Sequence, residues 1–194
     1  MLEKRDFYID GAWVAPQAGT DCQVIDPATE NPCAVISLGG QADTDAAVEA
    51  ARRAFPGWAS TPLTDRIALV ERILECYNAR AEDLSQAMSL EMGAPIDLSR
   101  EQQTPLGTSH IKAFLRAAKN FTLQEPLGPH APTTQIRHEP IGVCGLITPW
   151  NWPMNQVTLK AIPALLAGCT AILKPSEVSP LSSILFAEIL DEAG

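Results

Sequence analysis

Apolar residues recur every three or four positions through the middle of the chain, which is the spacing of one face of a helix. The first run starts after Asp43, which we expect to cap a helix that ends before Pro56. The second starts at residue 64 or 65 and continues to a stop signal at residues 93–95, and the third occupies residues 106–121. This pattern predicts a bundle of three or four helices between residues 43 and 121.

Short segments of β-branched and aromatic residues precede these helices. Residues 7–14 predict a hairpin around Asp10 and Gly11, because an Asp-Gly pair accepts the positive φ angles of a two-residue turn. Residues 23–25 and 34–37 predict a second pair of strands with a turn-rich segment between them. The chain is therefore expected to open with small antiparallel elements.

Proline and glycine recur through residues 124–140, so this segment lacks the helical spacing of the part before it. A strand-like run lies inside this segment, at residues 133–138. We expect residues 124–140 to form an extended connector whose strand pairs with something outside the helical unit.

After residue 140 the pattern changes to strand, helix, strand, helix. The continuous apolar run at residues 143–148 predicts a strand buried on both faces of a parallel sheet, and residues 170–174 predict the second such strand. A helix interrupted by Pro163 connects them, and another starts at Pro180. Because two strands alone cover little surface, we expect apolar residues such as Leu166 and Phe186 to lack neighbours.

Composition narrows the class of protein. The 194 residues carry 14 Lys and Arg against 23 Asp and Glu, a net charge of -9, which argues against a nucleic-acid partner. The longest apolar stretch, residues 161–173, is too short and too interrupted to span a membrane, and the N-terminus has no secretory signal. Five cysteines at unrelated spacings, with no Cys-x-x-Cys pair, predict reduced thiols and a cytoplasmic location.

Polar side chains follow both predicted parallel strands. In open α/β sheets, ligands bind beyond the carboxyl ends of the strands. Residues 148–151 follow the first strand and residues 174–177 follow the second, so both loops are expected to open on the same crevice.

Two strings carry a specific resemblance: Gly-Val-Cys-Gly-Leu-Ile-Thr-Pro-Trp-Asn-Trp-Pro at residues 142–153 and Lys-Pro-Ser-Glu-Val-Ser-Pro at residues 174–180. The chain resembles the N-terminal part of the aldehyde dehydrogenase superfamily over its whole length, most strongly from Arg137 onward. The resemblance implies an α/β fold in which small β hairpins and helices precede the first two βα units of a Rossmann-like parallel sheet. It divides the chain at residues 1–123, 124–140 and 141–194: the hairpin and helical part, an oligomerisation arm, and the start of the NAD-binding sheet.

The resemblance also implies a reaction, in which an aldehyde, NAD+ and water give a carboxylic acid and NADH. Asn151 would donate a hydrogen bond to the oxyanion that forms on the former carbonyl oxygen. Lys160 would relay a proton. From the residues alone, Asn151 could equally be a turn residue and Lys160 an ordinary residue on a helix face.

For the cofactor, the resemblance places Lys174 and Glu177 on the adenosine ribose. A carboxylate there would repel a 2′-phosphate, which favours NAD over NADP. The residue types alone also fit a solvated ion pair. Further cofactor contacts are implied at Ile147, the last residue before the first loop, and at Thr148, Pro149, Trp150 and Ser176 in the loops.

A monovalent cation is the last implied ligand, with Glu91 and backbone oxygens near Ile25 and Val178 around it. The alternative is a simple carboxylate at a helix end. Cys144 and Cys169 lie in and just before the predicted strands, and both are expected to be core residues.

The resemblance also predicts what these residues do not supply. None of the five cysteines matches the family's nucleophile, and its general-base Glu has no counterpart here. We therefore expect an N-terminal fragment of an enzyme that acts on a small aldehyde and forms homo-oligomers, with the 194-residue chain inactive by itself. The alternative is a short non-catalytic relative that binds nucleotide or joins a subunit interface.

Overall fold

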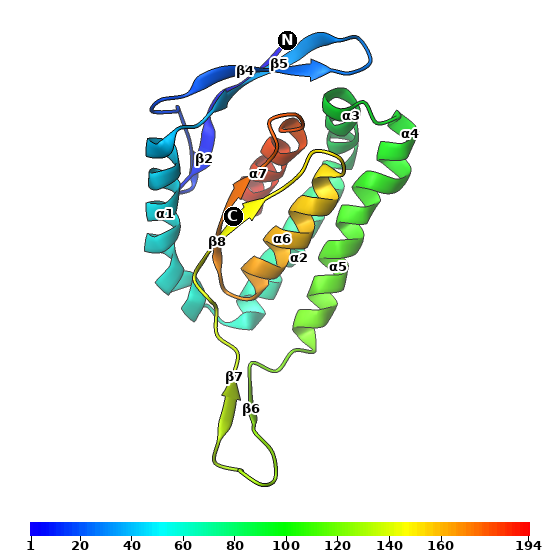
Figure 1. Ribbon diagram of the computed structural model, residues 1–194. Coiled ribbons are helices and arrows are strands. Elements are labelled where there is room, and N and C mark those ends of the chain that lie inside the picture. Colours follow the sequence, from blue (N-terminus) through cyan, green and yellow to red (C-terminus); the bar gives the residue numbers. More distant parts are fainter.

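Helices pack around two parallel strands, and a separate sheet lies across one end of them (Figure 1). The structure is a computed structural model that describes residues 1–194. Its strands are β1 (Leu2–Lys4), β2 (Phe7–Ile9), β3 (Ala12–Val14), β4 (Thr20–Asp26), β5 (Asn31–Leu38), β6 (Gln124–Pro126), β7 (Gln135–Arg137), β8 (Val143–Ile147) and β9 (Thr170–Lys174). Its helices are α1 (Gln41–Ser60), α2 (Leu63–Ala79), α3 (Ala81–Met92), α4 (Ile96–Leu98), the π-helical turn Ser99–Gln103, α5 (Thr104–Lys119), α6 (Pro153–Leu166) and α7 (Leu181–Ala193).

The N-terminal strands confirm both predicted antiparallel pairs. Asp10 and Gly11 have φ angles of 56° and 73°, and the hairpin of β2 and β3 closes around them. β4 pairs with β5 as expected. β1 adds a parallel strand on the other side of β5, with Leu2 opposite Ala34, and this pairing was not predicted.

The first helix differs from its prediction at both ends. α1 passes through Pro56 and ends at Ser60, so the expected end before Pro56 is wrong. Pro56 lies on the exposed side, where water can bond to the carbonyl that the missing N–H leaves free. Asp43 is also not the cap residue itself; it lies in the first turn and accepts the N–H groups of Gly40 (2.9 Å) and Gln17 (2.7 Å).

The later helices follow the predicted pattern more closely. Gly93 ends α3 with a φ angle of 72°, which confirms the predicted stop. Pro163 lies inside a continuous α6, so the predicted interruption is wrong. The carbonyl that Pro163 leaves unpaired belongs to Leu159, which is exposed on the surface of the helix.

One hydrophobic core joins the helical part of the chain to residues 141–194. It contains 16 buried residues from α2, α3, α5, α6, α7 and β8. Leu166 and Phe186 are 6% and 0% exposed, so the expectation that they lack neighbours is wrong. Tyr77 lies in the same core and donates its hydroxyl to the carbonyl of Thr104, at 3.1 Å, where α2 meets α5.

β8 and β9 form the predicted parallel pair, with Ile147 opposite Lys174 at the carboxyl ends. The expectation that β8 is buried on both faces is wrong, because Leu146 is 8% exposed and Ile147 is 72% exposed. Successive side chains point to opposite faces, and the core covers only the face of Leu146. On the other face α1 packs near the strand starts, where the Thr170 hydroxyl donates to the Ala51 carbonyl at 2.9 Å.

The connector forms its own hairpin, which extends away from the helices (Figure 1). β6 pairs with β7 inside residues 124–140, and pairing of this hairpin with another subunit stays a prediction. The strand is also shorter than the predicted run at residues 133–138, since β7 covers only Gln135–Arg137.

Candidate active site

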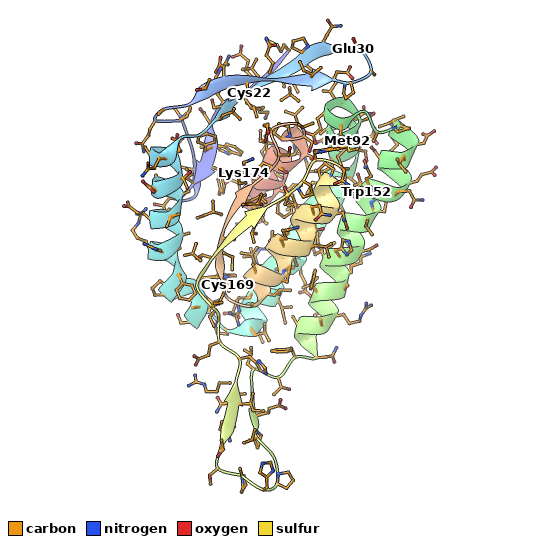
Figure 2. The ribbon with its side chains drawn as sticks, viewed as in Figure 1. Cys22, Glu30, Met92, Trp152, Cys169 and Lys174 are labelled. Carbon is orange, nitrogen blue, oxygen red and sulfur yellow. The ribbon has the colours of Figure 1, made fainter.

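The two polar loops leave the same edge of the parallel sheet, as predicted. The Thr148 N–H donates to the Lys174 carbonyl at 3.2 Å, which extends the pairing of β8 and β9 by one step. Figure 2 shows Lys174 at the end of β9 and Trp152 where α6 begins. The structure therefore brings the loop at residues 148–151 beside the loop at residues 174–177.

Asn151 lies in the turn between β8 and α6. It is exposed, and it comes two residues before Pro153, the first residue of the helix. Pro153 suits this position because its missing N–H would have no partner in the first turn of a helix. The amide of Asn151 thus lies next to a helix N-terminus, where negative charge is stabilised. Such a position suits a donor to a developing oxyanion.

Lys174 and Glu177 form an exposed ion pair, with the ammonium nitrogen 3.3 Å from a carboxylate oxygen. Hydrogen bonding by the Glu177 backbone N–H, and then the Lys174 ammonium, hold the pKa of the Glu177 carboxyl below its usual range. Glu177 is therefore an ionised acceptor at neutral pH. Exposed pairs of this kind contribute little to stability, so both side chains are free to bind a diol instead.

The other loop residues fall into two groups. Ile147 and Trp150 are 72% and 52% exposed, and Pro149 is exposed as well, so all three offer surface to a ligand. Thr148 is only 4% exposed and holds the loop through its backbone. Ser176 is half-buried, and its hydroxyl accepts the N–H of Val178 at 3.2 Å, which shapes the turn after β9.

Ser179 is a site residue that no sequence pattern indicated. It is 1% exposed, and its hydroxyl donates to the carbonyl of Trp150 at 3.2 Å. The bond joins residues that are 29 positions apart. The only local signal, a Ser-Pro pair before an apolar run, indicated the start of α7 and no contact to another loop.

Lys160 is not brought to the two loops. Its ammonium donates to the side-chain oxygen of Gln156 at 2.9 Å, on the same helix. Lys160 lies about 10 Å along α6 from Pro153, given the rise of a helix. Its hydrogen bond to Gln156 is typical of an ordinary residue on a helix face. A proton-relay role for Lys160 stays a prediction.

Glu91 lies at the end of α3 and is fully buried. Its carboxylate accepts the Leu181 N–H, the Ser182 N–H at 3.2 Å and the Ser182 hydroxyl at 2.5 Å. Burial raises the pKa of Glu91 to about 7, and the Ser182 and Leu181 donors oppose that rise. The carboxylate thus caps α7 just after the loop that carries Glu177, and cation binding stays a prediction.

The cysteines of the parallel sheet have the environment of core residues. Cys169 is 4% exposed, and Cys144 is half-buried. Burial, and then the neighbouring Cys169 thiol, raise the pKa of Cys144, which disfavours the reactive thiolate.

The structure holds no cluster of three or more His, Cys, Asp or Glu side chains arranged for a metal ion. None of its helices is long and apolar enough to cross a bilayer.

Comparison with known proteins decides the family. Residues 13–194 match the model of the aldehyde dehydrogenase family. The chain belongs to this family. Over its whole length it is 45% identical to a 3-succinoylsemialdehyde-pyridine dehydrogenase of Pseudomonas sp, of which it covers 40%.

Solved aldehyde dehydrogenases share the fold. The Bartonella henselae enzyme superposes with a TM-score of 0.98 at 56% identity, over 100% of this chain and 40% of its own. Aldehyde dehydrogenase C of Pseudomonas syringae, solved with NAD+ and octanal, superposes with a TM-score of 0.94 at 47% identity, over 98% of this chain and 38% of its own. The chain thus spans about 40% of the length of these relatives, and its α/β architecture is the one predicted.

Proposed function

We propose that residues 1–194 are the N-terminal part of an NAD-dependent aldehyde dehydrogenase, which converts an aldehyde, NAD+ and water to a carboxylic acid and NADH. The observation that carries the proposal is the shared edge of β8 and β9, where Asn151 lies beside the loop of Lys174 and Glu177. The relative solved with NAD+ and octanal supports both ligand classes.

Each loop has its own part in this proposal. The Asn151 amide donates to the oxygen that gains negative charge when a thiolate attacks the aldehyde, and one such donor is worth about 100- to 1000-fold in rate. The bound cofactor supplies the acceptor for the hydride. Lys174 and Glu177 hold its ribose. The rest of the contact comes from the exposed surface of Ile147, Pro149 and Trp150, and from Thr148 and Ser176, which shape the two loops. The thiolate and the general base come from outside residues 1–194.

The choice of NAD over NADP rests on the charge of Glu177. Its ionised carboxylate would face a 2′-phosphate at close range, and the repulsion between like charges disfavours NADP. Lys174 pairs with Glu177 and weakens this repulsion, but it does not remove the carboxylate that the 2′-phosphate would meet.

The remaining predictions belong to the same proposal. The hairpin of β6 and β7 pairs subunits in a cytoplasmic homo-oligomer. A proton relay at Lys160 and a monovalent cation at Glu91 are further parts of this proposal. Lys160 donates to Gln156, and Glu91 accepts the Ser182 hydroxyl.

Aldehyde-dependent formation of NADH tests the proposal. The complete native polypeptide that contains residues 1–194 is purified beside the 194-residue chain, and both are assayed with NAD+ and a series of aliphatic and aromatic aldehydes. We expect NADH from the complete polypeptide and none from the 194-residue chain. A complete polypeptide that binds NAD+ but oxidises no aldehyde would favour the alternative, a non-catalytic relative. Activity of the pure 194-residue chain would contradict the assignment of the nucleophile to another part of the protein.

A further inference from the structure

Ser179 stands between the two loops of the candidate site. It follows the loop of Lys174 and Glu177, yet its hydroxyl reaches the carbonyl of Trp150 in the other loop, at 3.2 Å. Ser179 is 1% exposed, so its side chain is shielded from water on the donor side of this bond. Trp150 is 52% exposed, so its position depends on such backbone contacts more than on packing of its side chain.

We propose that Ser179 is a positioning residue that fixes Asn151 through the Trp150 carbonyl. The inference rests on the proposed function of Asn151. The Trp150 carbonyl and the Asn151 nitrogen belong to one planar peptide unit. Holding the carbonyl therefore restrains this plane and, with it, the position of the Asn151 Cα, to which the side chain is attached.

Ser179 is itself well anchored, which a positioning residue requires. Its N–H donates to the Ser176 carbonyl at 3.3 Å. Ser176 belongs to the loop at residues 174–177, which we call the nucleotide loop. On the other side, Glu91 binds the first N–H groups of α7, at Leu181 and Ser182. The hydroxyl thus projects from a segment that is held at both ends, and its bond to the Trp150 carbonyl restrains the loop of Asn151.

The contact also connects the two halves of the site. At the base of the loops, the Thr148 N–H bonds to the Lys174 carbonyl. At the far end, the Ser179 hydroxyl bonds to the Trp150 carbonyl. Two hydrogen bonds therefore join residues 148–150 to the segment of residues 174–179, one at each end. A cofactor that orders the loop of Glu177 would also order the peptide that carries Asn151.

The chain provides a matched control. Ser183 lies one helical turn further along, in α7, and is 4% exposed. Its hydroxyl has no hydrogen-bond partner. The variant Ser183→Ala therefore removes a buried hydroxyl close to Ser179 without removing a bond between the loops.

The test compares Ser179→Ala, Ser179→Thr and Ser183→Ala in the complete native polypeptide. Amide hydrogen exchange of peptides that cover residues 149–152 is measured for each, together with kcat and the KM for NAD+. We expect Ser179→Ala to speed exchange and to lower kcat by about fivefold each, the equivalent of one hydrogen bond. The KM for NAD+ rises by less than kcat falls, since the ribose-binding side chains of Lys174 and Glu177 are unchanged.

Ser179→Thr keeps the hydroxyl and restores both exchange and kcat, while Ser183→Ala leaves both at the wild-type values. Wild-type exchange at residues 149–152 in Ser179→Ala would overturn the inference, and so would equal effects of Ser179→Ala and Ser183→Ala. If the wild-type polypeptide oxidises no aldehyde, the proposed function fails, and hydrogen exchange still decides whether Ser179 holds the loop.

Discussion

Replacing Glu91 by Gln tests how the start of α7 is held. Glu91 is fully buried, and every contact of its carboxylate is with a donor at the N-terminus of that helix: the Leu181 N–H, the Ser182 N–H and the Ser182 hydroxyl. Burial raises its pKa from the ordinary 4.5 to about 7. Gln keeps the shape and one acceptor oxygen but carries no proton that titrates in this range.

The size and sign of the effect follow from the raised pKa. Between about pH 4.5 and pH 7 the folded protein keeps a proton on Glu91 that the unfolded chain has released. The free energy of unfolding that Glu91 contributes is therefore largest below pH 4.5 and falls as the pH rises through this window. A shift from 4.5 to about 7 corresponds to a loss of about 3 kcal/mol relative to a side chain that does not titrate.

Urea denaturation of the wild type and Glu91→Gln, at several values between pH 4.5 and pH 8, measures this difference. We expect the stability of the wild type to fall relative to Glu91→Gln by up to about 3 kcal/mol across the range. Glu49→Gln, at an exposed position of α1, serves as the control for loss of a surface charge. If the wild type instead gains stability relative to Glu91→Gln as the pH rises, the donors of α7 outweigh burial and the reasoning is refuted.

Two further variants test the core and the nucleotide loop. In Gly107→Ala, the new Cβ would lie 2.1 Å from the hydroxyl oxygen of Tyr77 and 2.7 Å from its ring, so we expect a loss of about 1–3 kcal/mol in urea denaturation. A loss near zero would show that α2 and α5 are not held at this close approach. In the complete polypeptide, Glu177→Gln should lower the ratio of kcat/KM for NAD to that for NADP by about threefold to tenfold, because the repulsion of the 2′-phosphate is removed. An unchanged ratio would contradict the ribose role of Glu177.

Local patterns were sufficient to locate the candidate site. The strands β8 and β9 have continuous apolar runs, and polar residues follow each of them directly. Because parallel neighbours end at the same edge, the sequence alone placed Asn151 beside Lys174 and Glu177. The hairpin around Asp10 and the stop at Gly93 were predicted for the same reason, since each depends on a few adjacent residues.

Contacts between distant residues could not be predicted in this way. Glu91 and Ser182 are 91 positions apart, and Ser179 and Trp150 are 29 apart, so no local spacing signals either bond. The course of α1 through Pro56 has the same explanation: proline disfavours a helix locally, and packing of α1 against the sheet keeps it intact. Tertiary contacts decide these features, and they concern how the site is held more than where it lies.

The most direct test of the central claim is the kinetics of Asn151→Ala in the complete polypeptide. If the Asn151 amide stabilises the oxyanion, kcat for aldehyde oxidation falls about 100- to 1000-fold while the dissociation constant of NAD+ stays within about twofold. Trp152→Phe, a change at the adjacent half-buried residue, controls for general disturbance of the loop. A kcat for Asn151→Ala within about fivefold of the wild type would contradict the claim that Asn151 provides the oxyanion donor.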